Sequence, residues 1–295
     1  MKMRAFQYHR PDTLVEALAV LAEFGGDAKV IAGGQSLVPM MAMRLSTPDH
    51  IVDISKVPGL DEIKVAEGFL TIEAMVRHAV AETNPLVATA APLVFAAMPH
   101  IGHRAIRNRG TVCGSLAHAD PAAELPAVAR ALDAEFVVAS STGVRLVPAA
   151  EFFVGYLTSA LADSEMVTAV RFPVADPNTV VSVTEVSRRH GDFALAGCAA
   201  QLSIAANGTI DTAAMALFGV DSVPYRSAVA EAMLVGNMST SDVFAAASAA
   251  MIADLHPPAD NHGSTAYRRH LAGVLVRRAL ADAASKISHN VGALA

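Results

Sequence analysis

Apolar residues recur every three to four positions near the N-terminus of the chain. On one face of an expected helix at 13–24 they are Leu14, Leu18, Leu21 and Ala22. Asp12 or Thr13 can cap the start of this helix, and Gly25-Gly26 can end it. Short apolar runs at 29–32 and 51–54 then predict two buried strands. This part of the chain therefore predicts an alternating α and β unit.

The middle of the chain predicts further helices and strands, with one stretch that lacks regular spacing. Strands are expected at 69–72 and 167–172 and in a hairpin of 135–139 with 144–147, and helices near 75–81, 92–98 and 124–132. Residues 109–119 are rich in Gly, Ser, Thr and Ala without periodicity, which predicts a functional loop. Residues 173–177 are typical of a linker.

The last third of the chain has a different pattern. Residues 200–204 alternate apolar and polar positions, Asn207-Gly208 is a hairpin turn signal, and 213–218 can return as the partner strand. Ala-rich helices follow, the last near 267–287. Residues 178–290 therefore predict a three-stranded antiparallel sheet backed by helices.

Composition narrows the class of protein. The 295 residues are 53% hydrophobic and 17% charged, and a net charge of −6 without a dense Lys/Arg block argues against a nucleic-acid partner. The longest charge-free window, 193–210, is interrupted by Gln201 and by Asn207-Gly208, so no membrane-spanning helix is expected. The N-terminus lacks the apolar stretch of a signal peptide, and we expect a cytoplasmic location. Two cysteines are too few to ligate an iron–sulfur cluster by themselves.

A glycine pair follows the first predicted strand, in the run Ala32-Gly33-Gly34-Gln35-Ser36-Leu37. Consecutive glycines let the backbone approach a ligand and adopt positive φ, and their N–H groups can form an anion nest. The Ser36 hydroxyl can add a donor. The run suits a phosphate or pyrophosphate, and an ordinary strand-to-helix turn is the alternative. It is not the G-x-G-x-x-G fingerprint of dinucleotide-binding folds.

A second stretch of small residues lies at 107–121. Gly110 and Gly114 remove side-chain bulk from it, and hydroxyls can donate hydrogen bonds there. These hydroxyls belong to Thr111 and Ser115. Glu124, further along, can accept hydrogen bonds from the hydroxyls of a ribose. A pyrophosphate with an attached sugar suits this set, and a tight buried crossover that needs small residues is the alternative.

A third candidate segment is 188–194, with paired arginines, Asp192 and Phe193. It is either a structural salt-bridge corner or the site of an aromatic cap over a flat ring system. His100 and His103 have a spacing that metal ligands can show, but no third ligand follows at a suitable spacing. No nucleophile elbow or self-sufficient catalytic triad is present, so neither a catalytic residue nor a metal ligand is assigned.

The chain resembles the FAD-binding medium subunits of the molybdenum hydroxylases, a family that includes aerobic carbon monoxide dehydrogenase and the dehydrogenases of N-heterocycles. The matching segments are Phe6–Pro11, Ala32–Leu37, Ile106–Thr111, Gly114–Pro121, Glu151–Phe153, Ser187–Ala194 and Tyr267-Arg268. Their order and spacing extend over nearly the whole chain.

The resemblance implies an α+β fold. Two FAD-binding subdomains of the vanillyl-alcohol-oxidase (PCMH) type are expected at 1–58 and 59–176. A C-terminal domain of the carbon monoxide dehydrogenase flavoprotein type, with a three-stranded antiparallel sheet and helices, is expected at 178–290. That agrees with the pattern of apolar positions described above.

The resemblance also implies which residues bind FAD. They are Ala32, Gly33, Gly34, Gln35 and Ser36 in the first turn, Thr111, Val112, Cys113, Gly114 and Ser115 in the second, and Gly102, Glu124, Asp192 and Phe193 elsewhere along the cofactor. Two residues depart from the family pattern. Cys113 replaces the first of two glycines, and Glu73 stands where glycine is frequent. A left-handed backbone at Cys113 would cost about 1 kcal/mol or more.

By resemblance, the chain is the FAD subunit of a heterotrimeric oxidoreductase that hydroxylates a small substrate. A large partner subunit is expected to carry a molybdenum–pterin cofactor, and a small partner two [2Fe–2S] clusters that deliver electrons to FAD in this chain. Two alternatives remain. One is a stand-alone flavin-dependent oxidoreductase, which would need its own substrate pocket. The other is a non-catalytic scaffold subunit that has lost FAD.

Overall fold

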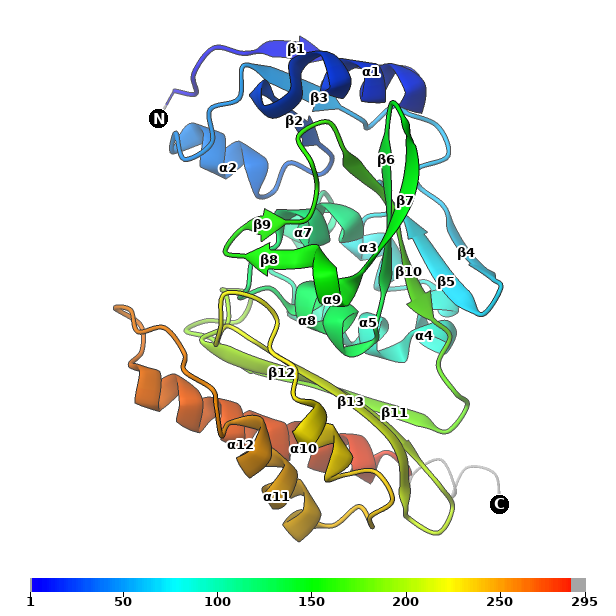
Figure 1. The fold of residues 1–295 in the computed structure, drawn as a ribbon, viewed down its shortest axis with the longest axis vertical. Helices are drawn as coiled ribbons and strands as arrows, with labels where there is room; N and C mark the ends of the chain where they lie inside the picture. Colours follow the sequence, from blue (N-terminus) through cyan, green and yellow to red (C-terminus); the bar gives the residue numbers. More distant parts are fainter. Residues whose placement is uncertain (1, 288–295) are drawn as a thin grey trace.

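The computed structural model describes residues 2–287, which form three successive units, each with its own β-sheet (Figure 1). The N-terminal unit is a parallel sheet with strand order β1-β3-β2. Its elements are β1 (Gln7–His9), α1 (Leu14–Phe24), η1 (Gly25–Asp27), β2 (Ala28–Ile31), α2 (Leu37–Ala42) and β3 (His50–Asp53).

The first helix begins and ends at the residues that the sequence indicates. The Thr13 hydroxyl accepts a hydrogen bond from the backbone N–H of Glu16 at 3.2 Å, which satisfies a donor of the first turn. Gly25 ends the helix with φ of +49°, a conformation that glycine adopts without steric cost. Ala17, Leu18 and Leu21 are buried. Prediction and structure agree here because the signals are local.

The middle unit contains a five-stranded antiparallel sheet of order β4-β5-β10-β6-β7 and a set of short helices. Its elements are β4 (Ile63–Ala66), β5 (Phe69–Glu73), α3 (His78–Ala81), α4 (Pro85–Ala90), α5 (Pro92–Ala97), η2 (Met98–His100), α6 (Arg104–Arg107), α7 (Val112–His118), α8 (Glu124–Ala131), β6 (Glu135–Ser140), β7 (Gly143–Pro148), α9 (Ala149–Phe152), β8 (Phe153–Gly155), β9 (Thr158–Ser159) and β10 (Met166–Pro173). Phe136 and Phe152 stack in its core with ring centroids 3.7 Å apart.

The expected loop at 109–119 is wrong for most of its length, because Val112–His118 form helix α7. Thr111 caps this helix, and its hydroxyl accepts a hydrogen bond from the Gly114 N–H at 3.1 Å. The small residues of α7 provide too few apolar positions for a helical period to be visible in the sequence. Strand β4 and helix α4 were not predicted either, and α3 is shorter than expected.

The C-terminal unit is the expected three-stranded antiparallel sheet, of order β11-β12-β13. Its elements are β11 (Thr179–Val186), β12 (Ala196–Ile204), β13 (Ile210–Phe218), α10 (Ala228–Ala232), α11 (Ser241–Met251) and α12 (Thr265–Ser285). The predicted turn is present at Gly208, which has φ of +87°. The last three residues of the expected domain at 178–290 lie outside the described residues.

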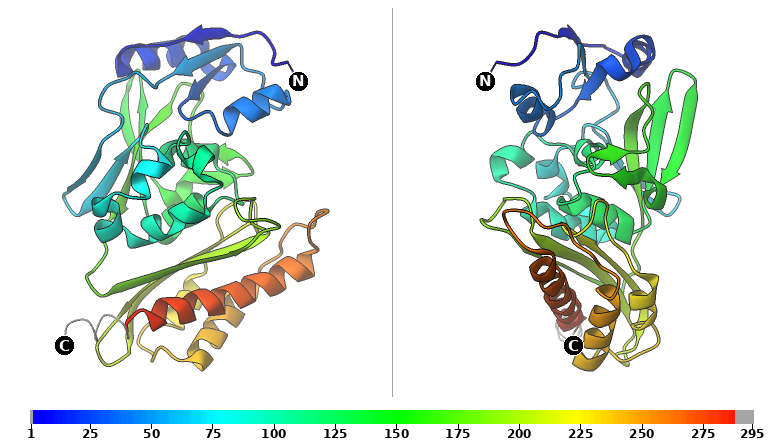
Figure 2. Two further views of the ribbon diagram at one scale, coloured as in Figure 1. Left: turned by 180° about the vertical axis from the view of Figure 1, so that it is seen from behind. Right: turned by 60° about the vertical axis from the view of Figure 1, so that its left-hand side comes forward.

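Both faces of this sheet are covered. Helix α12 packs against one face, with α11 beside it, and helices α5 and α8 of the middle unit pack against the other (Figures 1 and 2). Neighbouring residues of β12 accordingly belong to different cores, Ala199 to the larger one and Cys198 and Ala200 to the C-terminal one. The sheet therefore joins the C-terminal unit to the middle unit. Among residues 2–287, the structure contains no helix with the length and apolar character needed to span a bilayer.

Candidate functional site

The first glycine turn connects β2 to α2. Gly34 has φ of +72°, which is the left-handed conformation that the glycine pair predicts. The Gln35 side-chain amide donates to the Gly33 carbonyl at 3.2 Å and folds the turn back on itself. Ser36 precedes α2, and its side chain makes no capping hydrogen bond there, so its hydroxyl is available to a ligand.

The second turn precedes helix α7 and is held against α3. The His78 backbone N–H donates to the Gly110 carbonyl at 3.0 Å, and the Val112 N–H donates to the Val76 carbonyl at 3.0 Å. A Cβ on Gly114 would lie 2.6 Å from the Thr111 hydroxyl oxygen, so a larger residue there would displace the capping hydroxyl. The observed cap of α7 therefore favours glycine at this position.

The two glycine turns, distant in sequence, meet in space. A Cβ on Gly33 would lie 2.2 Å from the carbonyl oxygen of Arg109 and 2.6 Å from the Cα of Gly110. On the other side of the contact, a Cβ on Gly114 would lie 3.8 Å from the Cβ of Ala32. The backbones thus touch where side chains are absent, and their N–H groups can face one ligand.

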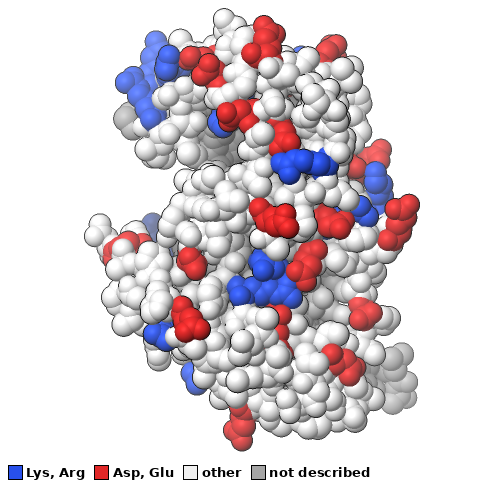
Figure 3. Space-filling model, in the orientation of Figure 1, with Lys and Arg blue, Asp and Glu red and all other residues white. Residues whose placement is uncertain are grey.

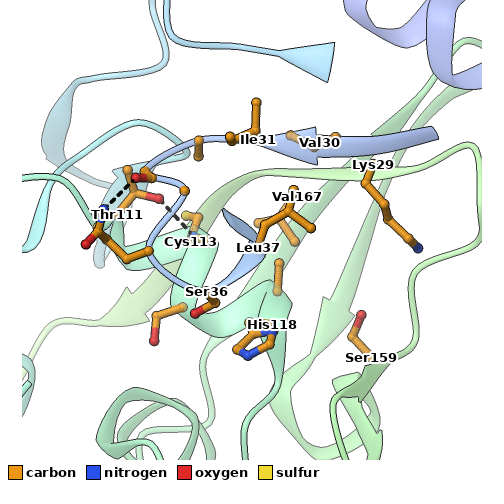
Figure 4. A pocket seen from close by; sticks show the side chains of 18 of the residues that line it. Lys29, Val30, Ile31, Ser36, Leu37, Thr111, Cys113, His118, Ser159 and Val167 are labelled. Carbon is orange, nitrogen blue, oxygen red and sulfur yellow. Dashed lines mark hydrogen bonds between the residues drawn. The ribbon is translucent and has the colours of Figure 1, made fainter. Parts of the chain in front are cut away.

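The turns line one cleft of about 650 Å³, a volume in the range of cofactor sites. Figure 3 shows the surface hollowed between the N-terminal unit and the rest, with Lys and Arg interspersed among Asp and Glu. All expected FAD-binding residues except Val112 line this cleft. Val112 is fully buried behind the second turn. Figure 4 shows Ser36 and His118 in the middle of the cleft, Thr111 on one side, and Lys29 and Ser159 on the other.

The backbone at Cys113 is not left-handed, so the cost that such a conformation would carry does not arise. Cys113 lies in the first turn of α7 and is not among the residues with positive φ, and neither is Glu73. The Cys113 thiol donates to the carbonyl of Ile72 on β5 at 3.4 Å, so its side chain is directed into the core. Burial raises the pKa of this thiol well above its usual value. A cysteine is therefore compatible with the geometry of the turn.

Glu124 is a buried carboxyl in the wall of the cleft, with 7% of its surface exposed. Burial raises its pKa from 4.5 to about 7, and the nearby Glu185 adds to the rise. His100 Nδ1 lies 3.5 Å from Glu185 Oε1, and that contact raises the pKa of His100. Glu124 therefore belongs to a cluster of buried and partly buried titratable groups between the middle and C-terminal units.

Segment 188–194 connects β11 to β12 and reaches the cleft from the C-terminal unit, where Asp192 and Phe193 line the wall. Phe193 keeps 64% of its surface exposed. Within the described part of the chain, this segment forms no internal ion pair, and Arg188 instead contacts His262, with Nη1 3.2 Å from Nδ1. The salt-bridge corner is therefore not what the structure contains.

Sequence reasoning missed His78, which also lines the cleft. It is 3% exposed, and neither ring nitrogen has a hydrogen-bond partner among residues 2–287. Burial, assisted by the charge of Arg107, lowers its pKa to about 4. The ring lies behind the second turn, where a Cβ on Gly110 would come within 3.0 Å of its Nδ1. A single histidine on a short helix carries no sequence signal that could have identified it.

The strip from the β8–β9 hairpin to β10 was also missed. It lines the cleft opposite the turns through Leu157, Thr158, Ser159, Leu161, Ala162, Asp163, Glu165, Met166 and Val167. Glu165 accepts two hydrogen bonds from Arg145, at 2.8 and 2.7 Å, which fix the path of this strip. Among the described residues, no group of three or more His, Cys, Asp or Glu side chains could hold a metal ion.

Comparisons with known proteins follow the same division of the chain. Residues 4–175 match the family described as "FAD binding domain in molybdopterin dehydrogenase", and residues 182–283 match "CO dehydrogenase flavoprotein C-terminal domain". The chain is 39% identical to the 6-hydroxypseudooxynicotine dehydrogenase complex subunit alpha of Paenarthrobacter nicotinovorans, with 96% of each chain covered.

Two further relatives support the same assignment. The medium chain of carbon monoxide dehydrogenase from Hydrogenophaga pseudoflava is 35% identical, over 93% of this chain and 96% of that one. The crystal structure of quinoline 2-oxidoreductase from Pseudomonas putida 86 superposes with a TM-score of 0.92 at 39% identity, covering 97% of this chain and 99% of that chain. With paired glycine turns in one cleft and this similarity over nearly its whole length, the chain belongs to the FAD-binding medium subunits of the molybdenum hydroxylases.

Proposed function

We propose that this chain binds one FAD non-covalently in the cleft, with both glycine turns around its pyrophosphate. The observation that carries the proposal is the contact of Gly33 with Arg109 and Gly110, which brings two sets of backbone N–H donors to one place. Aligned N–H groups of this kind bind phosphate oxygens. The cleft volume and the absence of side chains at the contact fit a dinucleotide.

The remaining cleft residues would contact different parts of such a cofactor. The hydroxyls of Ser36 and Ser115 can donate to the phosphates, and the Glu124 carboxylate can accept from ribose hydroxyls. Asp192 and Phe193 would lie along the flavin ring. When bound, FAD supplies reversible electron storage, while the protein supplies binding, orientation and electrostatics. No proton-transfer role is assigned to any residue of the chain.

Within a heterotrimer, we propose that electrons enter this chain from two [2Fe–2S] clusters of a small partner and leave to an external acceptor. A large partner with a molybdenum–pterin cofactor would hydroxylate the small substrate. The names of the relatives, which include quinoline 2-oxidoreductase and caffeine dehydrogenase, favour an N-heterocyclic substrate. The domain boundaries 1–58, 59–176 and 178–290 are part of this proposal, because among the described residues no sheet crosses a boundary: the two outer intervals contain one sheet each, and 59–176 contains the five-stranded sheet and the small β8-β9 sheet.

A cytoplasmic location is also part of the proposal. Cys113 and Cys198 are both free thiols, as expected for a protein of a reducing compartment. Fractionation of cells that express the chain, followed by detection of the protein in the cytosolic fraction, tests this location.

Titration of the purified chain with flavins tests the proposed cofactor. Because two turns meet around a diphosphate, FAD should bind at least about tenfold more tightly than FMN, which has a single phosphate. Quenching of flavin fluorescence measures both affinities, and denaturation of the purified protein should release FAD. A chain that binds neither flavin, or binds FMN as tightly as FAD, would overturn the proposal. Flavin reduction by a substrate in the isolated chain would instead favour a stand-alone oxidoreductase.

A further inference from the structure

Asp192 and Phe193 lie on the cleft wall in an irregular segment, residues 187–195, which connects β11 to β12. This segment forms no helix or strand of its own. Phe193 is 64% exposed and therefore is not fixed by packing into a core. Ala194 is buried in the larger core and Gly191 lies against His103, and further contacts hold the two ends of the segment.

One end of the segment is held by Arg268, at the start of α12. This side chain is 6% exposed, and its Nη1 donates to the carbonyl of Leu195 at 2.6 Å and to the carbonyl of Gly219 at 2.9 Å. Its Nη2 donates to Asp260 Oδ2 at 2.7 Å, which compensates the buried charge. A guanidinium can make these bonds simultaneously because its donors are fixed in one plane.

Gly219 extends this contact to the FAD-binding part of the chain. Its N–H donates to the carbonyl of Pro121 at 2.8 Å, in the connection between α7 and α8. Its φ is +76°, and a Cβ there would lie 2.8 Å from the Ala194 carbonyl oxygen. Leu195 is thus linked through Arg268 and Gly219 to the helices that follow the second glycine turn.

The other end of the segment contacts the same part of the C-terminal unit. Arg188 Nη1 lies 3.2 Å from His262 Nδ1, and the His262 backbone N–H donates to Asp260 Oδ1 at 2.8 Å. The Arg268 guanidinium beside Asp260 lowers the pKa of that carboxyl to about 2, so Asp260 is ionised at neutral pH. Residues 260–268 therefore brace both ends of segment 187–195.

From this geometry we infer that Arg268 is a positioning residue that holds Asp192 and Phe193 at the flavin ring. Within residues 2–287 it does not line the cleft and makes no hydrogen bond to an expected cofactor-binding residue, and it acts through the carbonyls of Leu195 and Gly219. The inference rests on the proposed FAD binding. The phosphate-binding turns lie in other units, so loss of Arg268 should change the surroundings of the ring far more than the affinity for FAD.

The test uses the full chain reconstituted with FAD and compares Arg268→Gln with Arg269→Gln. Arg269 is a matched control because it lies on the same helix and also donates to backbone carbonyls, of Ile252 and Ala253, outside the cleft. Three quantities are measured: the FAD dissociation constant, the visible circular dichroism of bound flavin, and quenching of its fluorescence by iodide. For Arg268→Gln we expect the FAD dissociation constant to stay within about twofold of the wild-type value, because the mutated site is distant from the phosphate-binding turns. We expect the visible dichroism of the bound flavin to change and the iodide quenching constant to rise by more than about twofold.

A double-mutant cycle with Phe193→Ala separates positioning from general loosening. If Arg268 acts by holding Phe193, then Arg268→Gln should add little to the ring signals once the aromatic side chain is gone. Gly219→Ala provides an independent route, because its Cβ would displace the Ala194 carbonyl from the other side. It should alter the ring signals in the same direction even if Arg268→Gln fails to fold.

The outcomes are distinct. A wild-type chain that binds FAD while Arg268→Gln and Gly219→Ala leave the dichroism and iodide quenching unchanged would overturn the positioning role alone. Equal changes in Arg269→Gln, or full additivity with Phe193→Ala, would overturn it as well. A wild-type chain that binds no FAD would overturn the proposed function, and this inference with it.

Discussion

In the absence of FAD, the buried Glu124 carboxylate should lower the free energy of unfolding at neutral and higher pH. Replacing Glu124 with glutamine should restore that free energy. A pKa raised from 4.5 to about 7 means that the folded protein disfavours the ionised carboxyl. Each tenfold change in an acid constant corresponds to about 1.4 kcal/mol, so the full cost is about 3 kcal/mol. Solvent screens this cost little, because Glu124 is only 7% exposed.

The sign of the pH dependence follows from linkage. Between pH 4.5 and 7 the folded state binds more protons at Glu124 than the unfolded state does, so the free energy of unfolding falls as the pH rises. The cost is absent below the unfolded pKa and complete above about pH 7. Glu124→Gln should therefore stabilise the apo chain by about 3 kcal/mol at pH 8 and by less than about 1 kcal/mol at pH 5.

Urea unfolding of the apo chain at several pH values measures this difference. Glu23→Gln, on the exposed face of α1, is the matched control and should show no such trend. The same substitution should have the opposite effect on the cofactor. If ribose hydroxyls donate to the ionised carboxylate, Glu124→Gln should weaken FAD binding while stabilising the apo protein. An apo stabilisation that is equal at pH 5 and pH 8, or a loss of stability at pH 8, would refute the assigned environment of Glu124.

Two further predictions concern the turns and the histidine behind them. Gly33→Ala places a Cβ 2.2 Å from the Arg109 carbonyl oxygen, so we expect a loss of about 1–3 kcal/mol in the free energy of unfolding and no measurable FAD binding. Gly155→Ala, with open space around it, should change neither quantity. Unfolding curves and flavin titrations measure both, and unchanged FAD affinity in Gly33→Ala would contradict the convergence of the turns. His78 has a folded pKa near 4 against an ordinary value of 6.5, so the stability that its neutral form allows should be lost as the pH falls from about 6.5 to 4, by about 3 kcal/mol in total. His78→Gln should abolish this part of the pH dependence in urea unfolding, and an unaltered acid limb would count against it.

Much of the fold was predictable because its signals are local. A capping threonine and an apolar stripe define α1, and alternation around a tight turn defines the β6–β7 hairpin. The paired glycines of the first turn predicted a left-handed backbone conformation, which the structure shows at Gly34. Each of these features depends on residues within a few positions of one another, so a single sequence contains the information.

The parts that could not be predicted depend on contacts between distant segments. The burial of His78 behind Gly110 and the approach of His100 to Glu185 arise only when separate elements pack together. Helix α7 was missed for a different reason. Its stability derives from its cap and from packing of residues such as Leu116, and its small side chains hide the helical period.

Because Gly33 packs directly against the Arg109–Gly110 peptide, the conformation of each turn depends on the presence of the other. Neither turn can be moved alone into another scaffold, because each supplies the surface on which the other rests. Loop grafts or chimaeras within this family would have to exchange both turns together, along with the backbone spacing between them.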